Sequence, residues 1–170
     1  MNSRSSHDAE PNGSDSDAFT ADELEIWSSV ATLLEWLPAA LDAQMQRDST
    51  ISHFEYGILF ALSQADEESL TMKELAGFAN STLSRLSRAV ARLERRQWVT
   101  RGPDPDDGRT TIATLTESGL AATRAAAPGH VALVRRLVFD SLTPAQARAL
   151  GSASRRITSA IADEGGWRPQ

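Results

Sequence analysis

The stretch Arg101–Thr116, RGPDPDDGRTTIATLT, decides the fold of this chain. At its centre Asp107-Gly108 lies between two extended segments, which predicts a β-hairpin because glycine tolerates the positive φ that such turns need. The turn gathers three aspartates around one arginine: Asp104, Asp106 and Asp107 around Arg109. Taken alone, this composition is explained by a solvated turn. A functional interpretation depends on what precedes the hairpin.

Two short helices are expected before the hairpin. The first covers roughly residues 72–79, and the second runs from Thr82 to about Arg96 after the punctuation Asn80-Ser81-Thr82. The hairpin strands are expected at 98–101 and 109–115. Helix, turn, basic helix and hairpin in uninterrupted order are the layout of a winged helix-turn-helix. We therefore predict a mainly α fold with a small β-hairpin wing.

The helix at 82–96 divides its faces sharply at 100° per residue. One stripe is apolar and is formed by Leu83, Leu86, Val90 and Leu93, and the opposite stripe is formed by Arg85, Arg88, Arg92 and Arg96. Ser81, Thr82 and Ser84 lie at the N-terminal end, where a recognition helix presents side chains to base edges. The predicted DNA-binding residues of this helix are Ser81, Thr82, Ser84, Arg85, Arg88 and Arg92. A solvated basic face is the alternative, and the order of the surrounding elements favours DNA.

Helices are also expected on both sides of this region. Four segments carry a Ser or Thr followed three residues later by Glu or Gln, the signature of a capping box: Thr20–Glu23, Ser52–Glu55, Thr71–Glu74 and Thr143–Gln146. They predict helices at about 21–47, 53–65, 72–79 and 144–163, with a kink at Pro38 in the first. Thr116 is expected to cap a further helix that Pro128-Gly129 interrupts.

The charge of the chain is distributed unevenly. The formal net charge is −6, but seven acids against Arg4 in residues 1–25 account for all of it. Residues 82–101 contain six arginines and a single acidic residue, Glu94. The negative net charge of the chain therefore does not exclude DNA binding. Residues 1–19 are expected to be a disordered acidic tail and residues 164–170 a flexible C-terminus. Without cysteine or a membrane-spanning segment, we expect a soluble, cytoplasmic protein that makes no disulfides.

The segment Leu70–Gly119 resembles the core of the MarR family of bacterial transcription regulators. The family's wing signature, Asp-x-Arg followed by Leu-Thr and Gly, matches Asp107, Arg109, Leu115, Thr116 and Gly119. Including the flanking helices, the resemblance covers residues 20–163. The chain departs from the family at Gln97, where a glycine usually separates the recognition helix from the wing. The exit geometry of that helix is therefore open.

The resemblance implies a homodimer that binds double-stranded DNA at a pseudo-palindromic operator. Its winged helix-turn-helix would span about 52–116 and its helical dimerisation region about 20–47 and 117–163, which agrees with the large apolar surface of those helices. In similar proteins the wing arginine enters the minor groove and a neighbouring aspartate holds it, which assigns these roles to Arg109 and Asp107. Similar proteins also bind small aromatic anions between the dimer helices and the winged lobe.

Other chemistry finds little support in the sequence. The three histidines are too scattered for a metal cluster, and the chain has no nucleotide-binding or catalytic motif, so we expect no metal, no cofactor and no enzyme. The expected signal is a small aromatic or phenolic effector, with Trp27, Trp36 and His53 as candidate pocket residues. The regulator is expected to be a repressor. The rival interpretation is a protein-interaction module that uses the winged lobe as a scaffold.

Overall fold

The computed structural model describes residues 18–105 and 107–164. Residues 1–17 of the predicted acidic tail, residues 165–170 of the predicted flexible C-terminus, and Asp106 lie outside the described residues. The chain divides into two compact units, residues 1–37 and 38–170. Their boundary lies inside the first helix, immediately before Pro38, where the sequence predicts a kink.

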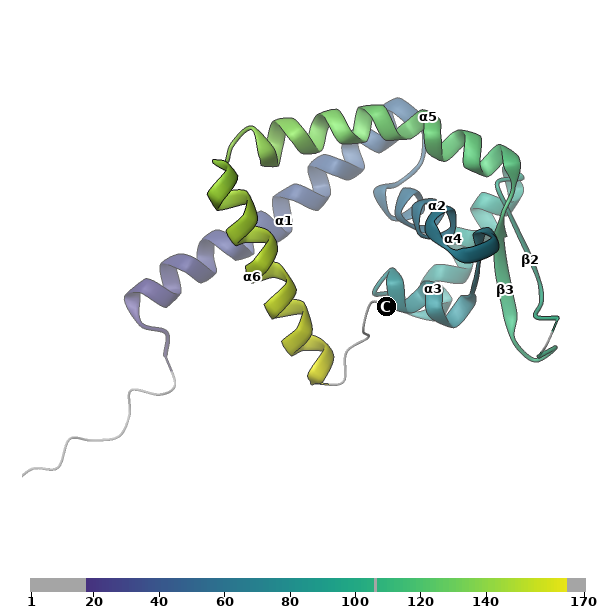
Figure 1. Ribbon diagram of the computed structural model, residues 1–170, viewed down its shortest axis with the longest axis horizontal. Coiled ribbons are helices and arrows are strands. Elements are labelled where there is room, and N and C mark those ends of the chain that lie inside the picture. Colours follow the sequence, from purple (N-terminus) through teal and green to yellow (C-terminus); the bar gives the residue numbers. More distant parts are fainter. Residues whose placement is uncertain (1–17, 106, 165–170) are drawn as a thin grey trace, which may run out of the picture. The chain divides into compact units, whose positions relative to one another are not determined.

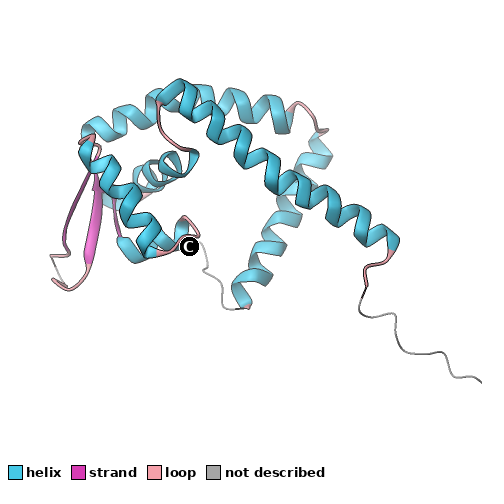
Figure 2. Cartoon of the chain, turned by 180° about the vertical axis from the view of Figure 1, so that it is seen from behind, coloured by secondary structure: helices cyan, strands magenta, loops and turns pink. Residues whose placement is uncertain are grey.

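The described chain is mainly helical, as predicted (Figures 1 and 2). In chain order the elements are α1 (Ala21–Ser49), α2 (His53–Gln64), a 3-10 turn η1 (Asp66–Glu68), β1 (Ser69–Thr71), α3 (Met72–Phe78), α4 (Leu83–Arg95), β2 (Val99–Pro103), β3 (Thr111–Leu115), α5 (Glu117–Val134), a π-helical turn η2 (Arg135–Phe139) and α6 (Pro144–Asp163).

The hairpin β2–β3 belongs to a three-stranded antiparallel sheet with the order β1-β3-β2. Val99 pairs with Leu115 in the hairpin, and Leu70 pairs with Ala113 on the other edge of β3. The sequence pattern did not predict β1. Its three residues are too few for a periodic signal, and tertiary pairing, which includes a 2.8 Å hydrogen bond between the Ser69 and Thr114 hydroxyls, makes them a strand.

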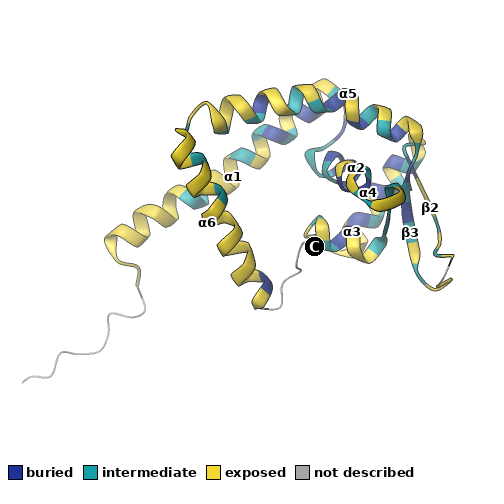
Figure 3. Ribbon diagram, in the orientation of Figure 1, coloured by how far each residue is buried: buried dark blue, intermediate teal, exposed yellow. Residues whose placement is uncertain are grey.

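The apolar core lies in the second unit, among α2, α3, α4 and the sheet. Figure 3 shows the buried positions gathered on these elements, and the most deeply buried side chains include Ile58, Leu59, Leu62, Leu75, Leu86, Val90 and Leu93. Phe54 lies partly buried at the core's edge. Along α1, Leu24 and Leu34 are 52% and 60% exposed in the single chain, whereas Leu41 nearer the end of the helix is buried.

All four predicted capping boxes are present. The hydroxyls of Thr20, Ser52, Thr71 and Thr143 accept from the backbone N–H three residues later, and the Glu or Gln at that position accepts from the cap residue's own N–H. Each box satisfies two backbone donors that a helix start leaves without partners. The starts of α1, α2, α3 and α6 are therefore encoded locally.

The predicted interruption at Pro128-Gly129 is wrong, because α5 runs unbroken from Glu117 to Val134. Proline removes one helical hydrogen bond, but Ala126 before it and Leu133 after it are both buried, so packing holds both halves in one helix. The glycine at position 129 is explained by its contact with another helix. A Cβ there would lie 3.0 Å from Nε2 of Gln44 and 3.2 Å from a carboxylate oxygen of Asp48, so glycine permits close approach to α1.

The exit of α4 resolves the question that Gln97 raised. Gln97 adopts a left-handed conformation with φ 62°, the conformation that the family's glycine would take. Its N–H donates to the carbonyl of Glu94, and the N–H of Trp98 donates to that of Leu93, which together form a Schellman motif. The same motif ends α3 at Asn80, with φ 41°. The exit geometry is thus retained with a residue that carries a Cβ.

Candidate nucleic-acid interface

The inner face of α4 fixes which residues it can present to a partner. Leu86, Val90 and Leu93 are fully buried as predicted, and Ala89 is buried beside them. Leu83 departs from the predicted apolar stripe because 55% of its surface is exposed. It is the first residue of the helix, and helical side chains point back toward the N-terminus, so it lies beyond the last layer of the core.

The predicted arginine stripe is partly occupied by contacts within the fold. Arg92 forms a salt bridge with Glu55 at 2.5 Å, and Arg96 donates to the carbonyl of Thr50 at 2.7 Å. Burial by itself would raise the pKa of Glu55, but hydrogen bonds from the Ser52 backbone and from Arg92 outweigh it and hold the pKa below its usual range. Arg92 and Arg96 therefore fasten α4 to the α1–α2 junction.

The other two arginines of the stripe stand nearer the N-terminal end of α4. The guanidinium of Arg85 lies over the Phe54 ring, 4.4 Å from its centroid. Arg88 donates to the carbonyl and hydroxyl of Ser84, one turn earlier, so its guanidinium is drawn toward the start of the helix. An open groove of about 560 Å³ runs past these residues and is lined by Asp42, Ser52, Phe54, Arg85, Arg88 and Arg92.

The opposite flank of α4 is held by the wing. Arg101 of β2 donates to the carboxylate of Glu94 at 2.5 and 2.9 Å and to the hydroxyl of Ser87 at 3.1 Å. The helix is therefore clamped between the α1–α2 junction and β2. At 100° per residue, the side chains midway between the two clamps are those of Ser84, Arg88 and Arg95, which are all exposed. Arg95 was not among the site residues predicted from sequence, because only these tertiary contacts reveal which arc of the helix faces outward.

The hydroxyls at the start of α4 mostly serve the helix itself. Thr82 is the N-cap and accepts from the N–H of Arg85 at 3.3 Å, while Ser81 donates to the carbonyl of Thr82 at 3.3 Å. The six predicted residues of the recognition helix lie on α4 or in the two positions before it. They differ in exposure and in how far contacts within the fold already use them.

The wing loop brings Asp107 next to Arg109. Its carboxylate accepts from the backbone N–H of Arg109 at 3.1 Å, from the hydroxyl of Thr110 at 3.0 Å and from Nε of Arg109 at 3.4 Å. The backbone N–H bond, followed by the Thr110 hydroxyl, holds the pKa of Asp107 below its usual range. Its shortest contacts are with the Thr110 hydroxyl and the Arg109 backbone rather than with the guanidinium. The main role of Asp107 is therefore to shape the turn, and its contact with the Arg109 side chain is secondary.

Arg109 itself projects into solvent, with 96% of its side chain exposed. The loop that carries it is wider than a two-residue turn, since Asp104 N–H donates to the carbonyl of Thr110 and Thr110 N–H to that of Asp107. Gly108 does not have the positive φ that the sequence pattern predicted for it. Hydrogen bonds of Asp107 close the loop instead.

Gly119 of the predicted signature has a steric role at the base of the wing. A Cβ there would lie 2.1 Å from the carbonyl oxygen of Trp98 and 2.9 Å from its carbonyl carbon. Thr116 caps α5 and also donates to the carbonyl of Gln97 at 2.7 Å, as does Ser118 at 2.8 Å. The first turn of α5 therefore packs directly against the backbone that follows α4, and only a glycine at position 119 permits this close approach.

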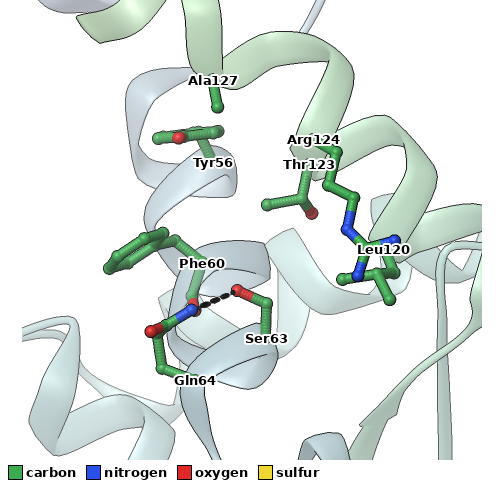
Figure 4. A pocket seen from close by; sticks show the side chains of 8 residues that line it. All are labelled: Tyr56, Phe60, Ser63, Gln64, Leu120, Thr123, Arg124 and Ala127. Atoms are coloured by element: carbon green, nitrogen blue, oxygen red, sulfur yellow. Dashed lines mark hydrogen bonds between the residues drawn. The ribbon is translucent and has the colours of Figure 1, made fainter.

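The predicted effector residues do not share a described pocket. Trp27 and Trp36 belong to the first unit and are 50% and 75% exposed, whereas His53 belongs to the second. A pocket of about 220 Å³ instead lies between α2 and α5 (Figure 4). Its lining combines aromatic and polar side chains from the two helices: Tyr56, Phe60, Ser63 and Gln64 from α2, and Leu120, Thr123, Arg124 and Ala127 from α5.

His53 stacks on His130 of α5, with ring centroids 5.5 Å apart, and Tyr56 lies 4.9 Å from the same His130 ring. Burial lowers the pKa of both histidines; the nearby Asp42 carboxylate partly opposes this for His53, and His53 adds to it for His130. Nδ1 of each ring is buried without a hydrogen-bond partner. The pair therefore favours the neutral state and acts as packing between α2 and α5.

Within the described residues, no group of three or more His, Asp or Glu side chains is placed to hold a metal ion. Among residues 18–105 and 107–164, none of the helices has the length and the apolar run that a membrane span needs. What the lobe does offer is cationic and hydrogen-bonding groups on α4 and at the wing tip.

Comparisons with known proteins agree with this geometry. The sequence model of the MarR family matches residues 50–110. The fold is similar to that of Sco3205, a MarR family transcriptional regulator from Streptomyces coelicolor whose crystal structure is a complex with DNA. That likeness has 43% identity, a TM-score of 0.81 and coverage of 85% of this chain and 94% of Sco3205.

Two further relatives agree. AbsC, a MarR family transcriptional regulator from Streptomyces coelicolor, is 31% identical with a TM-score of 0.81, over 86% of this chain and 98% of that one. YdcH of Bacillus subtilis, an uncharacterized HTH-type transcriptional regulator, is 30% identical over 80 residues. That match spans 46% of this chain and about half, 54%, of YdcH.

Proposed function

The chain belongs to the MarR family of winged helix-turn-helix transcriptional regulators, and we propose that it acts as a homodimeric repressor that a small organic ligand releases from its operator. Family membership makes it a DNA-binding regulator of transcription rather than an enzyme. The dimer, the DNA contacts and the effector are the proposed parts.

The observation that carries the proposal is the exposed cationic end of the winged lobe. Arg88 and Arg95 lie on the outward arc of α4, and Arg109 projects from the wing tip with 96% of its side chain exposed. Arginine donates to phosphates and guanine edges through a planar fork. We propose that the start of α4 enters the major groove and that Arg109 enters the adjacent minor groove. The crystal structure of Sco3205 with DNA supports DNA binding by this lobe, since that protein shares the fold and 43% of the sequence.

The dimer is supported by the apolar residues that the single chain leaves exposed. In α6, Leu150, Ile157 and Ile161 are 40%, 55% and 58% exposed, and in α1 the exposed set includes Leu24, Trp27, Leu33, Leu34 and Trp36. Patches of this kind mark interfaces in soluble proteins. A second copy of the chain would cover them and would present two winged lobes to the two half-sites of an operator.

The pocket between α2 and α5 is the site we propose for the effector. Its volume of about 220 Å³ suits a single-ring molecule, its wall includes the rings of Tyr56 and Phe60, and Arg124 supplies a cation. An aromatic carboxylate or phenolate fits that chemistry. Occupancy would be relayed through α2, because its first turn also carries Phe54 and Glu55, which contact Arg85 and Arg92 of α4.

The test of the DNA-binding surface is selection of bound fragments from a genomic DNA library at two salt concentrations, followed by titration of the selected site. Arg88→Ala should weaken binding and lower the magnitude of the salt slope by about 0.9 for each phosphate that the variant no longer neutralises. Arg148→Ala, which removes the same charge from α6 outside the winged lobe, is the matched control and should leave the slope unchanged. If no sequence is enriched, or both variants behave alike, the proposed interface is wrong.

The effector is tested on the same DNA complex. Single-ring aromatic carboxylates and phenols should release the parent protein, and Arg124→Ala should raise the concentration needed without changing operator affinity. Release of parent and variant at equal concentrations would place the effector elsewhere.

A further inference from the structure

Leu83 occupies an unusual position for a large apolar residue. It is the first residue of α4, with Thr82, Ser84 and Arg85 as neighbours, and 55% of its surface is exposed. The other members of its predicted stripe, Leu86, Val90 and Leu93, are fully buried. The core therefore does not explain why a leucine stands there.

The start of α4 is also where the proposed interface depends most on side-chain contacts with bases. Thr82 is engaged as the N-cap, and the hydroxyl of Ser84 accepts from Arg88. Leu83 stands between these two residues, and its side chain points beyond the helix start because Cβ atoms tilt toward the N-terminus. An aliphatic side chain at this end can make one kind of base-specific contact, with the C5-methyl group of thymine in the major groove.

We infer that Leu83 reads a thymine methyl group in each half-site of the operator. The inference rests on the proposed function, in which the start of α4 enters the major groove. The arginines supply charge and hydrogen bonds to phosphates and guanine, whereas Leu83 supplies apolar discrimination between thymine and cytosine or uracil. It is a specificity-determining residue for the proposed DNA binding, and the fold places it outside the core for that contact.

The experiment uses the full chain and the operator selected by the parent protein. Each thymine of a half-site is replaced in turn by deoxyuridine, which removes the methyl group and leaves base pairing intact. At one position of the half-site, this single replacement should weaken binding about fourfold, which is the change expected when one methyl group is no longer buried. The other deoxyuridine replacements should have smaller effects.

Leu83→Ala then tests whether this residue makes the contact. Leu83→Ala should bind the thymine site and the deoxyuridine site with equal affinity. The effects of the protein variant and of the deoxyuridine replacement should therefore not add. Leu83→Met retains an apolar tip and should keep most of the response to the methyl group. Arg88→Ala is the control: it should bind every probe more weakly and still show the full methyl response.

The outcomes separate the two levels of inference. If the parent enriches no sequence, the proposed function fails. If it enriches an operator but no thymine methyl affects binding, or if Leu83→Ala keeps the parent's response, the assignment of Leu83 is wrong and the proposed function stands. Because Leu83 lies outside the core, Leu83→Ala should unfold at the parent's temperature, which excludes misfolding as the cause of an absent response.

Discussion

The winged lobe and the terminal helices use their apolar residues in opposite ways. In the lobe, large side chains such as Leu59, Leu62 and Leu93 are fully buried within a single chain. In α1 and α6, residues of the same type remain exposed, among them Leu34 at 60% and Ile161 at 58%. Both regions have the periodicity of amphipathic helices. The difference is that the lobe contains both halves of each packing contact, whereas the apolar surface of the terminal helices needs another surface.

The lobe is also closed by polar contacts that cross between its elements. Glu55 to Arg92, Thr50 to Arg96, and Arg101 to Glu94 hold α4 on both flanks. Such contacts hold α4 in place without help from a partner. The comparison predicts that changes in the lobe act on folding and that changes in the terminal helices act on association.

The largest effect is expected from Gly119→Ala, which breaks the lobe. The added Cβ would meet the backbone of Trp98 at 2.1 Å, and backbone cannot move aside as a flexible side chain can. We expect the free energy of unfolding to fall by about 3 kcal/mol or more, the upper range for overpacking. Urea denaturation measures it, with Gly57→Ala as control because a Cβ at Gly57 meets nothing within 4 Å. Equal decreases in the two variants would contradict the steric role.

Next in size is Ile157→Ala in α6, which should act on association alone. Ile157 is 55% exposed in the single chain, so truncation should leave the folded lobe intact. If a second copy covers it, the dimer should lose about 2 kcal/mol per protomer. Sedimentation at several concentrations measures the dissociation constant. A parent protein that is monomeric and folded at micromolar concentration would remove the basis for the dimer.

Gln97→Gly should strengthen the lobe by a smaller amount. Gln97 has φ 62°, a conformation that costs a residue with a Cβ about 1 kcal/mol relative to glycine. The carbonyl that Thr116 and Ser118 contact is retained in the variant, so thermal unfolding should shift upward by a few degrees. Gly102→Ala is the opposite control, because it adds a Cβ at a position where the backbone does not have a positive φ. An unchanged or lower transition would mean that the glutamine side chain offsets its own strain.

The smallest effect is expected from pH at the stacked histidines. Burial lowers the folded-state pKa of His53 and His130 below the ordinary 6.5, so the unfolded chain binds protons first as the solution is acidified. Their contribution to stability is present above about pH 6.5 and is lost as the pH falls through the folded pKa. The unfolding temperature should therefore drop between about pH 7.5 and pH 5.5. His130→Phe, which keeps a ring against Tyr56, should flatten that dependence, and an unchanged profile would assign the effect to other groups.

The sequence determined the parts whose signals are local. The four capping boxes identified the starts of α1, α2, α3 and α6, and the hydrophobic periodicity identified the buried residues Leu86, Val90 and Leu93. Helix starts and helix faces depend on residues three or four positions apart, so their code is readable without the fold. The wing signature and its resemblance to the MarR family gave the architecture for the same reason.

Tertiary structure decided which of the residues that fit a sequence pattern are exposed and which are engaged in contacts within the fold. It assigned Arg92 and Arg96 to contacts within the lobe, exposed Leu83 and Arg95, made a strand of Ser69–Thr71, and kept α5 intact through Pro128. Each outcome depends on residues distant in sequence, from Glu55 beside Arg92 to Thr114 beside Ser69. A helical wheel gives the angle of a side chain but not what stands opposite it. The burial or exposure of a residue is a property of that opposing surface, and only the folded chain supplies it.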